Sequence, residues 1–171
     1  LDFSEKLLLE TYNADLVNTI GNLISRTISM IKQNFSKPIA FKDIDDDLNK
    51  NTINLIVKSF ENYKENLDNF RIFESFECIL NLARNLNKYI DLTMPWKLKD
   101  DLDKLSIILN ILLNGCYAIL AMIEIVCPDY VKEFKQIFNI NEFDFEQINN
   151  FHKFDNIVVN ENKIVFSKFK Q

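Results

Sequence analysis

The chain has 171 residues, of which 47% are apolar and 26% charged, and it contains only 2 glycines and 3 prolines. This composition excludes a disordered chain and indicates one domain with a sizeable core, built mainly from helices. The formal net charge of −5 excludes a protein that grips nucleic acid by bulk positive charge, so any such contact must rest on a local basic patch and on contacts to bases.

Apolar periodicity and helix-breaking residues predict six helical segments. In chain order they cover residues 4–35 (with a bend near Asn13 left open), 52–66, 70–93, 100–126, 129–138 and 144–150. Residues 36–50 contain Pro38 and three successive aspartates and are predicted to be a solvated connection. Residues 157–169 alternate and predict a short extended segment or hairpin. The expected fold class is all-α: one domain, 1–171, formed by a bundle of about five or six helices with a short extended C-terminal segment.

Residues 105–123 carry no charge and approach the length of a membrane span. Asn110, Asn114 and Gly115 interrupt this apolar run, and the amphipathic helices on either side need a buried partner. We therefore interpret it as the central helix of the bundle and expect no contact with a membrane.

Residues suited to catalysis are scarce. The single histidine, His152, has no predicted partner, two glycines are too few for a glycine-rich phosphate loop, and no Cys/His spacing suits zinc. Cys78, Cys116 and Cys127 are odd in number and lie far apart in apolar helical patterns, so we expect reduced core cysteines of a cytoplasmic protein. We predict no catalytic residue, metal or cofactor in this segment.

A first polar constellation lies in residues 13–26, NADLVNTIGNLISR. On a helical wheel, the positions within about 40° of Asn22 are Asp15, Asn18, Arg26, Ser29 and Gln33. A solvated face is the simplest interpretation. The alternative is that the amide of Asn22 and the guanidinium of Arg26, one turn apart, contact base edges and phosphates.

A second constellation lies in residues 85–98, NLNKYIDLTMPWKL. Asn87 falls at the inner edge of the apolar arc, where it is expected to hydrogen-bond a neighbouring element, and Asp91 falls at the outer edge. Pro95 restricts the backbone at the helix exit and so directs the only tryptophan, Trp96. Two positions of its indole stay open. It is either half-buried in the core, or exposed as a surface on which an unpaired base stacks, which contributes about 1–3 kcal/mol of binding free energy.

Taken together, the two constellations resemble the anticodon-binding domain of methionyl-tRNA synthetases. The first matches as N-A-D-x-x-N-x-x-G-N-L-x-S-R over residues 13–26, and the second as N-x-Y-I-D-x-x-x-P-W-x-L over residues 87–98. The resemblance extends over nearly the whole chain, including Phe3-Ser4-Glu5 at its start. The final VFSK (165–168) departs from the family's closing L-F-P-R segment, with serine where proline is usual.

The resemblance implies a helical bundle that follows a Rossmann-type class I catalytic domain, which would be its partner in the parent polypeptide. That enzyme would use ATP with magnesium to activate methionine and join it to methionine tRNA, while this segment binds the CAU anticodon loop and no DNA. The family's HIGH and KMSKS signatures are missing, and the chain starts with leucine and has no targeting leader, so we expect a piece of a longer polypeptide.

The resemblance also implies roles for individual residues. Trp96 would stack on the first anticodon base, and Asn22 and Arg26 would hydrogen-bond anticodon bases. Asn87, Asp91 and Pro95 would support the site.

Two other functions stay open. One is the equivalent helical domain of a class I synthetase for valine, isoleucine or leucine, against which the Pro95-Trp96 placement and the GNLxSR stretch count. The other is a helical module that binds protein through its exposed face, which predicts no RNA affinity and a tolerant Trp96.

Overall fold

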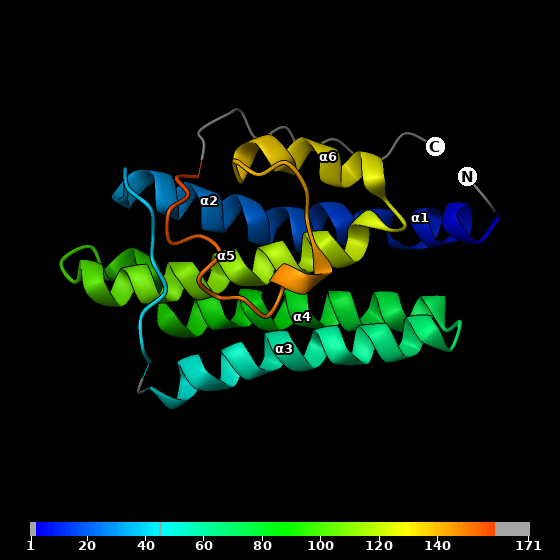
Figure 1. The fold of residues 1–171 in the computed structure, drawn as a ribbon, viewed down its shortest axis with the longest axis horizontal. Helices are drawn as coiled ribbons and strands as arrows, with labels where there is room; N and C mark the ends of the chain where they lie inside the picture. The colour runs from blue at the N-terminus through cyan, green and yellow to red at the C-terminus, as the bar shows by residue number, and fades with distance from the viewer. Residues whose placement is uncertain (1–2, 45, 160–171) are drawn as a thin grey trace.

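A computed structural model describes residues 3–44 and 46–159 of the chain, with side chains from Lys6 onward. Figure 1 shows long helices lying side by side in a bundle. The helices are α1 (Phe3–Asp15), α2 (Asn22–Asn34), α3 (Asp47–Asp68), α4 (Ile72–Thr93), α5 (Leu102–Glu124) and α6 (Pro128–Ile137). No strand occurs in the described ranges, and the expected all-α class is confirmed.

The first two helices form one continuous rod, joined by a π-helical segment, η1 (Leu16–Gly21). The residues that flank η1, Asp15 and Asn22, both keep right-handed helical backbone angles, so the chain does not break there. The predicted helix over 4–35 is therefore confirmed. The widened turn lies at 16–21 rather than near Asn13, and it places an additional residue in the helix.

Helices α3 and α4 pack against each other as a pair, and α3 begins five residues earlier than predicted. The side chain of Asp46 accepts a hydrogen bond from the backbone N–H of Asn49 at 3.0 Å and caps the helix. Asp47 lies in the first turn, where a carboxylate favours the positive end of the helix dipole. The prediction that this acidic run is only solvated connection was wrong, because two of its members start the helix.

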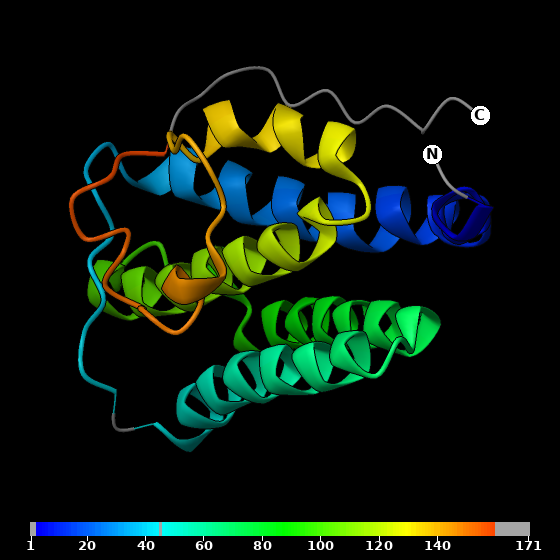
Figure 2. The same ribbon diagram turned by 45° about the vertical axis from the view of Figure 1, so that its right-hand side comes forward.

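Helix α5 lies between the α1–α2 rod and the α3–α4 pair, as Figures 1 and 2 show from two directions. In the described part of the chain it is the one helix long and apolar enough to cross a membrane, yet 94% of its most apolar window is buried inside the structure. A Cβ on Gly115 would lie 2.4 Å from Leu86 Cδ1, so the close approach of α5 to α4 depends on this glycine. The predicted central helix is confirmed.

The C-terminal part wraps over the bundle. Helix α6 begins with Pro128 at its first turn, a position that needs no N–H donor. The helix predicted over 144–150 was wrong: only a short 3-10 turn, η3 (Phe145–Gln147), forms there. Asp144 and Asn150 accept hydrogen bonds from the N–H groups two residues ahead, at 2.9 and 3.1 Å, and such Asx turns compete with helix. Most of the predicted extended segment (157–169) lies outside the described residues.

Candidate nucleic-acid interface

A polar hollow of about 520 Å³ lies between the η1–α2 part of the first rod and α4. We call it the α2–α4 hollow. Its lining consists entirely of polar and charged residues: Asn18, Thr19, Asn22, Ser25, Arg26, Arg84, Asn87, Lys88 and Asp91. Four of the six predicted site residues are among them, so the fold brings together two stretches that are about sixty residues apart in the sequence.

Arg26 spans the hollow from α2 to α4. Its Nη1 donates to Asn87 Oδ1 at 3.3 Å, and its Nη2 donates to Asp91 Oδ1 at 3.0 Å. The side chains of Arg26 and Asp91 are 38% and 67% exposed, so this ion pair stabilises the fold by only about 0–1 kcal/mol. Its main effect is to fix the plane of the guanidinium, which still has unused donors.

Asn87 fastens α4 to the π-helical segment. Its Nδ2 donates to the carbonyl oxygens of Thr19 in η1 and Ala83 in α4, both at 3.2 Å, while its Oδ1 accepts from Arg26. The expected hydrogen bond from Asn87 to a neighbouring element is confirmed. This one amide therefore sets both the spacing of the two helices and the orientation of the guanidinium.

Asn22 points its amide away from the core. The residue is exposed, and its side chain has no hydrogen-bond partner in the described part of the chain. An exposed amide with free donors and acceptor, next to a fixed guanidinium, is suited to pairing with the edge of a base.

Trp96 stands apart from the hollow. Helix α4 ends at Thr93. The next residue, Met94, adopts a left-handed backbone conformation (φ 47°), and the 3-10 turn η2 (Pro95–Lys97) follows. Pro95 is buried, whereas the residue Trp96 is 48% exposed and does not line the hollow. Leu92 and Met94 beside it are also exposed, so the end of α4 presents an apolar surface next to a polar one.

Five lining residues are not among the predicted site residues: Asn18, Thr19, Ser25, Arg84 and Lys88. Arg84, Lys88 and Asp91 recur at spacings of four and three on the exposed side of the helix predicted over 70–93, and this spacing was an available signal. Thr19 carried no such signal, because its carbonyl reaches Asn87 from the π-helical segment.

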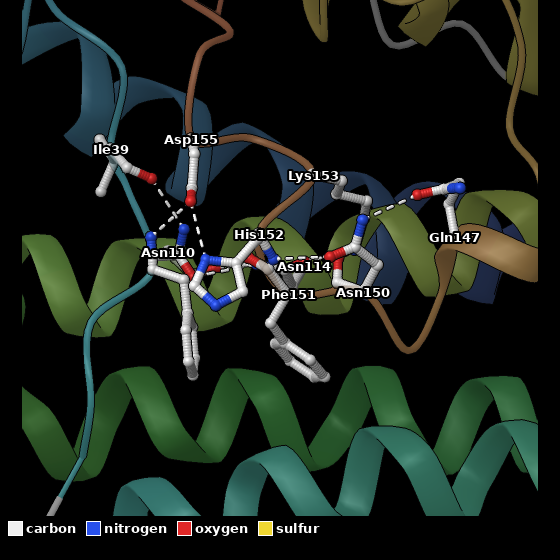
Figure 3. Close-up of polar contacts among 10 residues, drawn as sticks. Ile39, Asn110, Asn114, Gln147, Asn150, Phe151, His152, Lys153 and Asp155 are labelled. Atoms are coloured by element: carbon white, nitrogen blue, oxygen red, sulfur yellow. Dashed lines mark hydrogen bonds and ion pairs between the residues drawn. The ribbon is translucent and has the colours of Figure 1, made fainter.

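A second polar cluster lies on the other side of α5, and Figure 3 shows it. Asn110 and Asn114 stand one turn apart on α5. Asn110 Nδ2 donates to the Ile39 carbonyl oxygen at 2.7 Å, and Asn114 Nδ2 donates to Asn110 Oδ1 at 3.0 Å. Lys153 Nζ donates to Asn114 Oδ1 and to the Asn150 carbonyl oxygen. These contacts tie both the 35–46 connection and the 145–159 segment to α5.

The same cluster corrects the prediction that His152 lacks a partner. Its Nδ1 lies 2.7 Å from Asp155 Oδ2, while Asp155 Oδ1 accepts from the N–H of Phe41 at 2.8 Å. The Phe41 ring meets the imidazole edge-on, with centroids 5.0 Å apart. We call Asn110, Asn114, His152, Lys153 and Asp155 the α5 clamp; its contacts join segments of the fold.

A second hollow, of about 720 Å³, lies between the end of α5 and residues 142–145. Its charged lining residues are all acidic, namely Glu124, Glu142 and Asp144. Their negative charge repels the phosphates of a nucleic acid. Among the described residues, no group of three His, Cys, Asp or Glu side chains is arranged to hold a metal ion. The α2–α4 hollow is therefore the better candidate for an RNA contact.

Curated relatives of this chain include several methionine–tRNA ligases. No family model matches it. It is 39% identical to a methionine–tRNA ligase of Mycoplasmopsis pulmonis over 98% of this chain and 33% of that protein, and 35% identical to one of Fusobacterium nucleatum over 82% of this chain and 23% of that protein. The chain is homologous to part of methionyl-tRNA synthetase. It spans about a third or less of the length of these methionyl-tRNA synthetases.

Solved methionyl-tRNA synthetases share the fold. The free enzyme of Mycobacterium tuberculosis superposes with a TM-score of 0.83 over 97% of this chain and 35% of that one, at 17% identity. The same enzyme bound by methionyl-adenylate gives 0.71 over 84% of this chain, at 19% identity. The helical bundle is therefore the architecture of one part of methionyl-tRNA synthetase.

Proposed function

We propose that this chain is the anticodon-binding domain of a methionyl-tRNA synthetase and that it binds the CAU loop of methionine tRNA. One observation carries the proposal: the fold gathers Asn22, Arg26, Asn87 and Asp91 from two distant stretches around one hollow. The half-exposed Trp96 lies five residues beyond Asp91. The relatives named methionine–tRNA ligase support the choice of methionine over another amino acid.

The chemistry of these groups suits an unpaired RNA loop. Single-stranded bases are recognised by stacking on aromatic rings and by hydrogen bonds to their edges, which needs few groups and tolerates a net charge of −5. Trp96 stacks on the first anticodon base, for about 1–3 kcal/mol. The amide of Asn22 and the free N–H groups of Arg26 pair with base edges, and Asn87 and Asp91 hold the guanidinium in place.

The wider polypeptide is proposed to be a cytoplasmic methionine–tRNA ligase that consumes ATP with magnesium. Its amino-acid chemistry is assigned to a catalytic domain outside this chain, as the methionyl-adenylate held by the Mycobacterium tuberculosis enzyme suggests. Selection of the tRNA is the contribution of the segment described here.

A titration tests the proposal directly. The chain is mixed with an anticodon stem-loop that carries CAU, or with one whose first anticodon base is changed, and the fluorescence of Trp96, the only tryptophan, is followed. Quenching by the CAU loop that is lost or much weaker with the changed loop is the expected result.

Two outcomes would contradict the proposal. Equal quenching by both loops indicates an RNA binder without anticodon specificity. If neither loop binds, the full-length enzyme with Trp96→Ala is compared with its parent in aminoacylation of methionine tRNA, and unchanged activity would leave the protein-interaction module as the better function.

A further inference from the structure

Two basic residues of the α2–α4 hollow have no role in the function proposed above. Arg84 and Lys88 stand four residues apart on α4 and line the same hollow as Asn22 and Arg26. Neither falls on a position that the family pattern specifies, since Arg84 precedes the second stretch and Lys88 occupies an unspecified place within it. Residues at this spacing share one face of a helix, with their Cβ atoms about 5–6 Å apart.

Both cations are available to an incoming anion. Lys88 is exposed and has no ion-pair partner in the described ranges. Arg84 has a distant one there, Glu77, whose Oε2 lies 3.8 Å from its Nη1, and both of these side chains are 50% exposed. Such a pair is long for a hydrogen bond and weak in water. Arg26, by contrast, already contacts Asp91 at 3.0 Å.

The charge balance of the hollow differs from that of the molecule. Arg26, Arg84 and Lys88 stand against the single carboxylate of Asp91, whereas the whole chain is acidic. Because Asp91 and Asn87 hold Arg26, the charge not already balanced within the hollow belongs to Arg84 and Lys88. An RNA loop could place its phosphates at Arg84 and Lys88 and its bases at Asn22 and Trp96. Such a ligand would balance the positive charge and also use the free hydrogen-bonding and stacking groups.

We propose that Arg84 and Lys88 bind phosphates of the sugar–phosphate backbone of an RNA loop whose bases contact Asn22, Arg26 and Trp96. The inference rests on the RNA binding proposed above and adds a division of labour. The α4 cations supply affinity without regard to sequence, and the residues opposite and beyond them supply base discrimination.

The test combines substitution with a salt series. Arg84→Gln, Lys88→Gln and the double variant are titrated with the CAU stem-loop and with the changed loop at several salt concentrations, following Trp96 fluorescence. Each substitution is expected to weaken binding about 5-fold for both loops alike. It should also make the slope of the logarithm of the binding constant against log salt less negative by about 0.7. The preference for CAU stays as in the parent chain.

Two matched variants serve as controls. Lys132→Gln removes another exposed positive charge, on α6 outside the hollow, and should leave slope and affinity unchanged. Lys88→Arg keeps the charge and should keep the parent slope. Thermal melting followed by circular dichroism verifies that the exposed substitutions leave the fold intact.

The outcomes separate this inference from the proposed function. A parent chain that prefers CAU, together with Gln variants of unchanged slope, overturns the phosphate role alone. Gln variants that lose the preference for CAU overturn it too, because Arg84 or Lys88 would then contact bases. If the parent chain binds neither loop, the full-length enzyme is tested as above, and aminoacylation that Trp96→Ala leaves unchanged overturns the proposed function and, with it, this inference.

Discussion

The α5 clamp and the α2–α4 hollow are both polar clusters that join separate segments of the fold through asparagine and a basic side chain, yet they differ in burial. In the clamp, Asn110 and Asn114 are 1% and 0% exposed, and their amide groups are hydrogen-bonded within the protein. In the hollow, Asn22 is exposed and unpartnered among the described residues, and Arg26 keeps free donors. Asparagine content alone therefore does not mark a binding site; unused hydrogen-bonding capacity at the surface does.

The basic residues of the two clusters, Lys153 in the clamp and Arg26 in the hollow, also differ in their surroundings. Lys153 Nζ lies 4.6 Å from the centroid of the Tyr117 ring and 5.4 Å from that of Phe154, with no carboxylate ion-paired to it in the described ranges. Burial lowers the pKa of Lys153 to about 7. Arg26 faces a carboxylate at the surface instead. Desolvation of the Lys153 ammonium therefore costs free energy in the clamp, whereas Arg26 stays partly exposed to water beside its carboxylate.

The largest expected effect is on stability, at the clamp. Asn114→Leu removes the bond to Asn110 Oδ1 and leaves Lys153 Nζ without its amide acceptor, so we expect the free energy of unfolding in urea to fall by about 2–4 kcal/mol. The preference for the CAU loop should survive at temperatures where the variant is folded. Asn22→Leu in the hollow is the matched control, expected within about 0.5 kcal/mol of the parent. Equal losses of unfolding free energy at both positions would show that the clamp and the hollow do not differ in their contribution to stability.

The next effect is on binding, beside the hollow. Trp96→Ala should weaken binding of the CAU stem-loop by about 1–3 kcal/mol, because the stacking surface is lost, with little change in the unfolding free energy. Fluorescence anisotropy of a labelled stem-loop measures it, since the variant has no tryptophan. Leu92→Ala, at a residue that is even more exposed, is the control, and a comparable loss there would point to general apolar contact instead of stacking.

A smaller effect is the pH dependence of the clamp. Between pH 7 and the ordinary lysine pKa of 10.5, unfolded Lys153 binds a proton that the folded form has released. The unfolded state then binds more protons, so the stability of the parent relative to Lys153→Met should rise with pH, by up to about 1.4 kcal/mol per pH unit. Urea unfolding of both proteins at pH 7, 8 and 9 measures the difference. A difference that stays constant would show that the lysine is not desolvated.

The smallest effect on stability is expected at the ion pair of the hollow. Asp91→Asn and Arg26→Gln, singly and together, should give a coupling free energy of only about 0–1 kcal/mol in unfolding. The same variants should nevertheless reduce discrimination between the two loops, because the guanidinium loses its fixed orientation. A coupling above about 2 kcal/mol would contradict this prediction, because the ion pair would then stabilise the fold about as strongly as the contacts of the clamp.

Apolar periodicity was sufficient for the helices that form the core. The run over 105–123 and the apolar positions between 70 and 93 correspond to α5 and α4, because burial follows the helical period. The ends of the helices depended on local hydrogen bonds that periodicity does not contain. Asp46 extends α3 by capping it, and Asp144 and Asn150 form turns where a helix was expected.

The candidate site was predictable in some of its residues but not in its arrangement. The pattern of amide, guanidinium and indole pointed to Asn22, Arg26 and Trp96, and the structure places the first two in one hollow. Trp96 lies outside the hollow because Met94, just before it, adopts a left-handed backbone conformation. No local sequence pattern predicted this conformation. The pairing of His152 with Asp155 was hidden because the turn that brings them together was predicted to lie beyond a helix that does not form.

The π-helical segment makes the first rod tolerant of a change in length by one residue. If one residue of Leu16–Gly21 were deleted, the rod could close into a regular α-helix with little rotation of α1 relative to α2, because the wider turn already accommodates the additional residue. Tyr12 would then keep its contacts with the Phe76 ring and with Glu77, which it meets at 4.6 Å between centroids and 2.8 Å between oxygens. Natural variants should therefore differ in length by one residue in this segment, while the buried positions Leu16 and Ile20 stay apolar.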